Sequence, residues 1–251
     1  MKELCHGYFA TRIYLPLSEL SRRWRTFSRN IRGRSDPFSR NPQLPEVSWK
    51  DCTKQRSIRI WEREKENGNV RISELGILSA LAADCENGTN LFEIGTFDGR
   101  TTLNVALSSP AQCAIYTLDL PPGLEPVFSL VEGERHMVGK AKSGSRYEKH
   151  RGTYPAAVGK IHQLLGDSAA FDFSPYQASC SLVFVDGSHA FDCVMSDTRA
   201  AMDLAIGGGV VVWHDYGIWG DVTRALDELE RRESFGLRHI SGTSLVYWKK
   251  R

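Results

Sequence analysis

Acidic side chains follow five apolar segments of the chain, each near the point where the segment ends. They are Glu93, Asp119, Asp167, Asp186 and, after the fifth segment, the pair His214-Asp215. In open sheets of mostly parallel strands, ligands bind beyond the carboxyl ends of the strands. The fold itself does not require an acidic residue at the end of each of five strands. We therefore take these residues as the candidates for a ligand site.

The turn after the first segment is rich in glycine. It reads Glu93-Ile94-Gly95-Thr96-Phe97-Asp98-Gly99, and Thr101 stands at the start of the helix that should follow. Glycine lets the backbone approach a ligand closely. The spacing is not the G-x-G-x-x-G of dinucleotide-binding proteins, and Glu93 would repel a diphosphate. S-adenosylmethionine, which carries a sulfonium and an ammonium group and no phosphate, suits this turn better. A tight turn with no ligand is the alternative.

The next two segments end in side chains suited to a nucleoside. In nucleoside-binding folds of this type, an acid at the position of Asp119 accepts hydrogen bonds from the ribose hydroxyls. Asp167 and Ser168, at the end of the third segment, are placed to reach the base. The pattern therefore indicates a site for a nucleoside-containing cation.

The last two acids predict a metal site. Neighbouring strands lie about 4.8 Å apart, so Asp186 and Asp215 can share one cation, and oxygen ligands suit Mg²⁺. Such a cation would lower the pKa of a bound hydroxyl, and His189 could take its proton. Three alternatives stay open: Asp186 ends a simple turn, His189 caps the helix near Ala190, or His214 is a packed histidine.

The elements that must position these residues alternate between strand and helix. Strands are expected at residues 90–94, 114–118, 160–165, 181–185 and 210–213, with two more near 237–240 and 244–248. Helical spacing begins at Ile58 and again at Ile72, and further helices follow residues 100, 191 and 222. This order predicts an α/β fold, a doubly wound Rossmann-like sheet of seven strands, mostly parallel with one antiparallel strand near the C-terminus.

Six segments carry a family resemblance: FEIGTFDGRTT, TLDL, GDSAAF, VDGSHAFDCVMSD, LAIGGGVVVWHDYG and GTSLVYW. Together they resemble the class I S-adenosylmethionine-dependent methyltransferases. More narrowly, they are similar to the group that includes macrolide-sugar O-methyltransferases and cephalosporin-hydroxylase-like proteins. The resemblance covers about residues 70–250, and VDGSH and HDYG are its specific part.

The resemblance implies roles for particular residues. The methionine part of the cofactor would meet Glu93, Gly95 and Gly99, and Thr96 and Thr101 would belong to the same cofactor site. Asp119 would hold the ribose, and Asp167 with Ser168 would lie near the adenine. Asp186 would border the cofactor and bind a metal, His189 would be the general base, and Asp215 would be a second ligand. Relatives commonly carry two acidic ligands in the last motif, so the third ligand here is His214 or water.

The charge of the chain is unevenly distributed. The total is +2, but residues 1–40 hold nine Lys or Arg against three Asp or Glu. We interpret residues 1–54 as a basic extension with a linker near 33–48, and 55–251 as the catalytic domain. The net charge of the whole chain is near neutral, which argues against a nucleic-acid partner. The cysteine spacing and the absence of a long apolar run favour free thiols, a cytoplasmic location and no membrane.

The expected function is transfer of a methyl group to a hydroxyl of a small molecule such as a sugar, a phenol or a natural product. A nicotinamide-dependent oxidoreductase is one alternative. The other is a non-catalytic protein of the same fold that binds RNA or an anionic partner through its basic extension. That extension could also join two copies of the chain. The long segment 121–158 holds Arg135, Arg146 and Tyr147, which could contact acceptor or cofactor.

Overall fold

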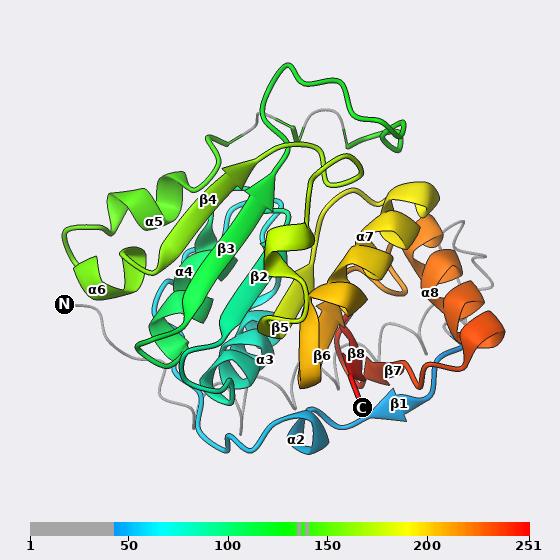
Figure 1. Ribbon diagram of the computed structural model, residues 1–251, viewed down its shortest axis with the longest axis horizontal. Helices are drawn as coiled ribbons and strands as arrows, with labels where there is room; N and C mark the ends of the chain where they lie inside the picture. The colour runs from blue at the N-terminus through cyan, green and yellow to red at the C-terminus, as the bar shows by residue number, and fades with distance from the viewer. Residues whose placement is uncertain (1–42, 135–136, 139–140) are drawn as a thin grey trace, which may run out of the picture.

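One sheet of eight strands runs through the part of the chain that the structure, a computed structural model, describes: residues 43–134, 137–138 and 141–251 (Figure 1). Its order is β1-β7-β8-β6-β5-β2-β3-β4. The strands are β1 (Glu46–Val47), β2 (Asn90–Ile94), β3 (Ala114–Asp119), β4 (Ile161–Leu165), β5 (Cys180–Val185), β6 (Ala205–Trp213), β7 (Arg238–Ile240) and β8 (Val246–Lys249). The predicted doubly wound fold is confirmed, with β1 as an addition to the seven expected strands.

The central strands are parallel, and only β8 runs against its neighbours β6 and β7. The register brings Ile94, Leu118, Val185 and Trp213 to one edge of the sheet, because Ile94 pairs with both Leu118 and Val185 and Val185 pairs with Trp213. The residues that follow these four strand ends therefore lie side by side. This is the edge at which ligands bind in such sheets.

Helices cover both faces of the sheet (Figure 1). On one face lie α3 (Ile72–Ala83), α4 (Arg100–Ser108) and the short α5 (Ser145–Lys149) and α6 (Pro155–Val158). On the other lie α7 (Phe191–Leu204) and α8 (Gly220–Glu233). Each layer has its own apolar core, centred on Leu75, Leu78 and Ile115 behind one face and on Val183, Leu204 and Leu226 behind the other. A 3-10 turn at Ser174–Tyr176 lies in the connection between β4 and β5.

The start of the domain differs from the expected boundary after residue 54. Glu46–Val47 pairs in parallel with β7, and the short helix α2 (Trp49–Cys52) buries Trp49 and Cys52 in the core. Residues 43–54 are therefore part of the domain, not of an extension or linker. The prediction of a helix from Ile58 is also wrong, because residues 58–71 form no helix. In this segment the side chains of Ile58, Ile60 and Val70 are buried.

Residues 1–42, with most of the basic extension, lie outside the described residues, as does Arg135. No helix in the described part of the chain is long and apolar enough to cross a membrane. The five cysteines of that part are free thiols.

Candidate active site

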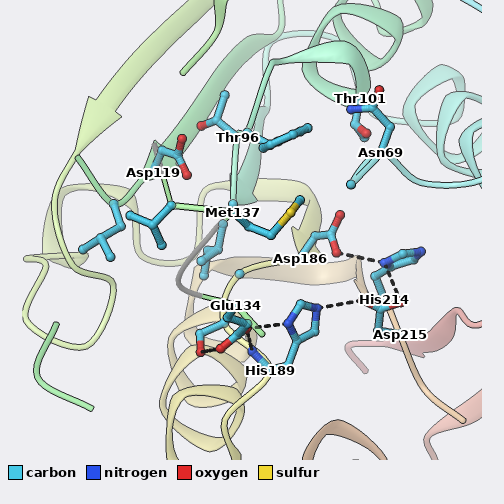
Figure 2. A pocket seen from close by; sticks show the side chains of 18 of the residues that line it. Asn69, Thr96, Thr101, Asp119, Glu134, Met137, Asp186, His189, His214 and Asp215 are labelled. Carbon is cyan, nitrogen blue, oxygen red and sulfur yellow. Dashed lines mark hydrogen bonds and ion pairs between the residues drawn. The ribbon is translucent and has the colours of Figure 1, made fainter. Parts of the chain in front are cut away.

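A cavity of about 760 Å³ lies at the carboxyl edge of the sheet. Its volume is within the usual range for sites that enclose a small molecule or cofactor. Ten of the twelve residues that the sequence singled out line this cavity: Gly95, Thr96, Thr101, Asp119, Asp167, Ser168, Asp186, His189, His214 and Asp215. The structure thus gathers residues from five strand ends into one site (Figure 2).

Gly95 lies where two strand ends meet. Its amide donates to the carbonyl of Leu118 at 2.8 Å, and the amide of Asp186 donates to the carbonyl of Ile94 at 2.8 Å. Gly95 has a φ of 99°, and a Cβ atom built there would lie 2.1 Å from the carbonyl oxygen of Asp186. Only glycine fits at this position, where the backbone of the turn meets the backbone of Asp186. The close contact fixes the position of Asp186 relative to the turn.

The replacement Gly95→Ala is expected to destabilise the protein by about 3 kcal/mol or more, because it adds a backbone clash to the left-handed strain. Gly88→Ala is the matched control. Gly88 has a φ of 84°, and a Cβ atom built there would meet nothing within 4 Å, so this replacement should cost only about 1–2 kcal/mol. Urea unfolding of both variants measures the difference, and equal losses would contradict the clash.

Two predicted cofactor residues, Glu93 and Gly99, do not line the described part of the cavity. The Glu93 side chain is buried and accepts hydrogen bonds from the hydroxyls of Thr102 in α4 and Thr117 in β3. Gly99 begins α4 with a φ of 84°, and a Cβ there would lie 2.5 Å from the ring of Tyr147. The structure therefore gives both residues a role in packing the turn, in place of the contact with a cofactor that we expected.

The end of the cavity that was predicted to hold a nucleoside is lined by Asp119 and Asp167. Asp119 is the last residue of β3, and burial raises the pKa of its carboxyl group. Asp167 accepts hydrogen bonds from the amides of Val127, at 2.6 Å, and Ala169, at 3.0 Å. The first of these joins the segment after β3 to the turn after β4. Both acids therefore keep the places that the sequence predicted.

Three possible metal ligands meet at the other end of the cavity. Ligand atoms of Asp186, His214 and Asp215 all lie within 4.8 Å of one another. His214 Nδ1 is 2.9 Å from Asp186 Oδ1 and 3.3 Å from Asp215 Oδ1. Asp215 has a φ of 65°, a conformation that is rare outside glycine and that clusters at functional sites.

A second histidine extends this cluster (Figure 2). His189 Nε2 lies 2.7 Å from Asp215 Oδ2, and its Nδ1 contacts Glu134 Oε1, which also accepts the His189 amide at 2.5 Å. The ring stacks on Trp219 at a centroid distance of 4.3 Å. The His189 side chain does not cap α7, because both of its ring nitrogens face carboxylates; its role as the general base stays a prediction.

These contacts shift the pKa values of the cluster. Burial would lower the pKa of His189, but Asp215 and Glu134 outweigh it and raise the pKa to about 9. Burial also opposes the charged form of His214, whose pKa is nevertheless raised well above its usual value by Asp186 and Asp215. Burial would raise the pKa of Asp215, but the two histidines hold it well below its ordinary range. The neighbouring carboxylates therefore favour the charged form of both imidazoles.

Glu74 and Glu134 belong to the site although the sequence did not single them out. Glu74 in α3 lies 3.3 Å from His214 Nε2, and Glu134 comes from the long segment between β3 and β4. The sequence held one indication of Glu74, which is the one charged residue of the helix α3. Glu134 left none, because its segment has no clear periodicity.

Described residues of the segment between β3 and β4 also line the cavity. Met137 lies across it, and a Cβ built at Gly68 would lie 2.3 Å from Met137 Cε (Figure 2). Arg146 pairs with Asp98 at 2.7 Å, while Asp98 also accepts from Asn69 at 2.9 Å. Tyr147 is buried and donates to Gln163. Arg146 and Tyr147 thus hold the glycine turn from behind and do not line the cavity.

Comparisons with known proteins agree with this geometry. Residues 92–216 match a family described as a methyltransferase domain. The O-methyltransferase NovP is 17% identical and has a TM-score of 0.56, with 72% of this chain and 80% of that chain covered. TomG from Streptomyces achromogenes, an O-methyltransferase solved in complex with SAM, is 17% identical with a TM-score of 0.50, covering 73% and 82%. Cofactor-bound Rv0187 from MTB is 18% identical with a TM-score of 0.52, covering 75% and 84%.

No curated protein matches the chain. At these identities the solved structures show a shared fold, whereas the matched domain spans the glycine turn, Asp119, Asp186 and Asp215. The matched family is described as a methyltransferase domain, not as an oxidoreductase. Residues 92–216 therefore form a methyltransferase domain, and the chain has the fold of the class I S-adenosylmethionine-dependent methyltransferases.

Proposed function

We propose that this enzyme methylates a hydroxyl group of a small molecule with the help of a divalent cation. The observation that carries the proposal is one cavity that joins the Gly95 turn and Asp119 to the cluster of Asp186, His214 and Asp215. The first part suits the cofactor, and the second part suits an oxygen acceptor. The O-methyltransferases NovP and TomG, which share the fold, support the same choice.

The cofactor would lie along the turn and the nucleoside end of the cavity. Gly95, Thr96 and Thr101 would border its methionine part, Asp119 would accept hydrogen bonds from the ribose, and Asp167 with Ser168 would face the adenine. The raised pKa of Asp119 reflects burial, and hydroxyl donors would compensate its charge. S-adenosylmethionine supplies the electrophilic methyl group.

The donor set of the acidic end fits a divalent cation. Four carboxyl groups, those of Glu74, Glu134, Asp186 and Asp215, surround two imidazoles, so two negative charges stay uncompensated when every group is ionised. Carboxylate and imidazole are common metal ligands. A bound cation would lower the pKa of an acceptor hydroxyl and stabilise the oxyanion. Asp186 and Asp215 would hold it.

His189 is the candidate for the group that takes the acceptor's proton. Glu134 holds its Nδ1, so Nε2 is the atom that can face an acceptor. Because Nε2 now faces Asp215 and the raised pKa of His189 favours the charged ring, this role requires two changes. The hydrogen bond between His189 and Asp215 must be released, and the ring must first lose its Nε2 proton to solvent. The cavity, with Trp219 against the imidazole ring, would hold the reacting groups in place.

Titration calorimetry with S-adenosylmethionine tests the cofactor site. The wild-type protein should bind, and Asp119→Ala should weaken binding about 10- to 100-fold, because it removes a hydrogen bond to a charged group. Asp203→Ala, at an exposed position of α7, should bind like the wild type. Equal affinity in all three proteins would contradict the assignment of Asp119 to the cofactor site.

The acceptor class needs a separate measurement. Formation of S-adenosylhomocysteine should depend on added hydroxyl compounds, which a panel of sugars, phenols and natural products would reveal. Turnover with amine acceptors alone would contradict O-methylation.

A further inference from the structure

Glu74 is a fully buried carboxylate that makes several hydrogen bonds. It lies in the first turn of α3, with no exposed surface. Its Oε1 accepts the amide and the hydroxyl of Ser244, both at 2.8 Å, and its Oε2 accepts the amide of Arg71 at 3.0 Å. Two of these three donors are backbone N–H groups, which cannot reverse their roles. Glu74 is thus held as an acceptor.

This acceptor determines which nitrogen of His214 keeps its proton when the ring is neutral. His214 Nε2 lies 3.3 Å from Glu74 Oε2, so the ring donates through Nε2–H. The other nitrogen, Nδ1, faces Asp186 Oδ1 at 2.9 Å and Asp215 Oδ1 at 3.3 Å. The imidazole therefore turns its Nδ1 atom toward the two carboxylates of the cluster.

We propose that Glu74 positions His214 as a nitrogen ligand, so that the site takes a first-row transition-metal ion in preference to Mg²⁺. This inference rests on the proposed cation site. Metal-binding histidines almost always donate their second N–H to a carboxylate or carbonyl, which fixes the tautomer and the ring orientation. Glu74, His214 and the pair of aspartates have this arrangement.

The choice of ion follows from the donor set. Mg²⁺ takes oxygen ligands and keeps several waters, whereas imidazole suits iron, zinc and related ions. One imidazole nitrogen and two carboxylates form a mixed set of nitrogen and oxygen ligands. A site that selects Mg²⁺ would need oxygen ligands alone. Glu74 is a positioning residue in this scheme, because it contacts His214 and does not line the cavity in the described chain.

Pulsed electron paramagnetic resonance with Mn²⁺ tests the proposal without any acceptor. Mn²⁺ added to the metal-free wild-type protein should show modulation from a directly bound imidazole nitrogen, and ¹⁵N-histidine labelling should change its frequency. The variant His214→Asn should lose this signal. His189→Gln should keep it, because the proposal gives His189 no bond to the metal.

The variant Glu74→Gln tests the positioning role. An amide offers one acceptor oxygen in place of two, so a backbone donor or His214 loses its partner. Mn²⁺ affinity should fall about 10- to 100-fold, as for other residues that orient metal ligands, and the nitrogen signal should weaken. Glu93→Gln, which replaces another buried glutamate, should leave both unchanged. Circular dichroism checks that each variant is folded.

The outcomes separate the two proposals. Mn²⁺ binding without a nitrogen signal in the wild type would overturn the role of His214 and leave a cation held by carboxylates. Equal binding by wild type and Glu74→Gln would overturn the role of Glu74, and displacement of Mn²⁺ by equimolar Mg²⁺ would overturn the preference. If Glu74→Gln does not fold, the wild-type and His214→Asn signals still decide. No binding of Mn²⁺ at all would overturn both the inference and the cation-assisted function.

Discussion

Replacing Asp215 with Asn should lower Mn²⁺ affinity by more than about 100-fold, because residues that merely orient metal ligands already contribute 10- to 100-fold. Asp215 contributes one oxygen beside His214 Nδ1 and a second that faces His189. Its carboxylate is thus shared by both histidines. An amide has no negative charge to offer either the cation or the imidazoles. Direct titration of the metal-free protein with Mn²⁺ measures the loss.

Asn is the suitable replacement because of the backbone. Asp215 has a φ of 65°, and Asn adopts this left-handed region more readily than Ala does. Asp215→Asn should therefore fold, whereas Asp215→Ala adds strain to the loss of charge. Asp221→Asn, at a partly exposed position in the first turn of α8, is the matched control and should bind Mn²⁺ normally. Normal binding by Asp215→Asn would restrict Asp215 to a hydrogen-bonding role.

The strand ends explain how much of the site could be predicted from the sequence. Asp119 is the last residue of β3, Asp186 follows β5, and His214-Asp215 follows β6. Because the register aligns these ends, a side chain at or just beyond each one reaches the same cavity. The alternation of strands and helices therefore predicted the fold, and the acids at the strand ends predicted most of the acidic residues that line the cavity.

Glu93 shows where the same rule fails. It is one residue short of the end of β2, so the alternation of side chains along a strand decides its direction. The register pairs it with Thr117 of β3, and both side chains turn toward α4 and not toward the cavity. An acid just before the end of a strand and an acid at or beyond the end look alike in a sequence, but here only the second kind lines the cavity.

The remaining differences come from contacts between distant parts of the chain. Glu134 reaches His189 across 55 residues, and Glu74 reaches Ser244 across 170. Glu46–Val47 joins the sheet beside β7, near the opposite end of the described chain. Short segments without periodicity carry no local signal of such pairings, and for this reason the boundary of the domain was placed too late.

Glu93 also leads to the last prediction, that the protein loses stability as the pH rises from about 5 to 8. Burial is the main cause that raises the pKa of Glu93 to about 8, with the charges of Asp186 and Asp119 acting in the same direction against the hydrogen bonds of Thr102 and Thr117. The ordinary value is 4.5. Between these values the folded protein keeps a proton that the unfolded chain releases, so the free energy of unfolding falls with pH.

The neutral replacement Glu93→Gln should remove this dependence. At about 1.4 kcal/mol per pKa unit, the wild type should lose roughly 4 kcal/mol relative to Glu93→Gln between pH 5 and pH 8.5. Urea unfolding of both proteins with a chelator present measures the difference, and groups that titrate alike in both cancel. Glu233→Gln, at the exposed end of α8, should behave like the wild type at both pH values. A difference between wild type and Glu93→Gln that does not change with pH would show that the buried carboxyl is ionised throughout. The hydroxyls of Thr102 and Thr117 would then stabilise its charge more than burial opposes it.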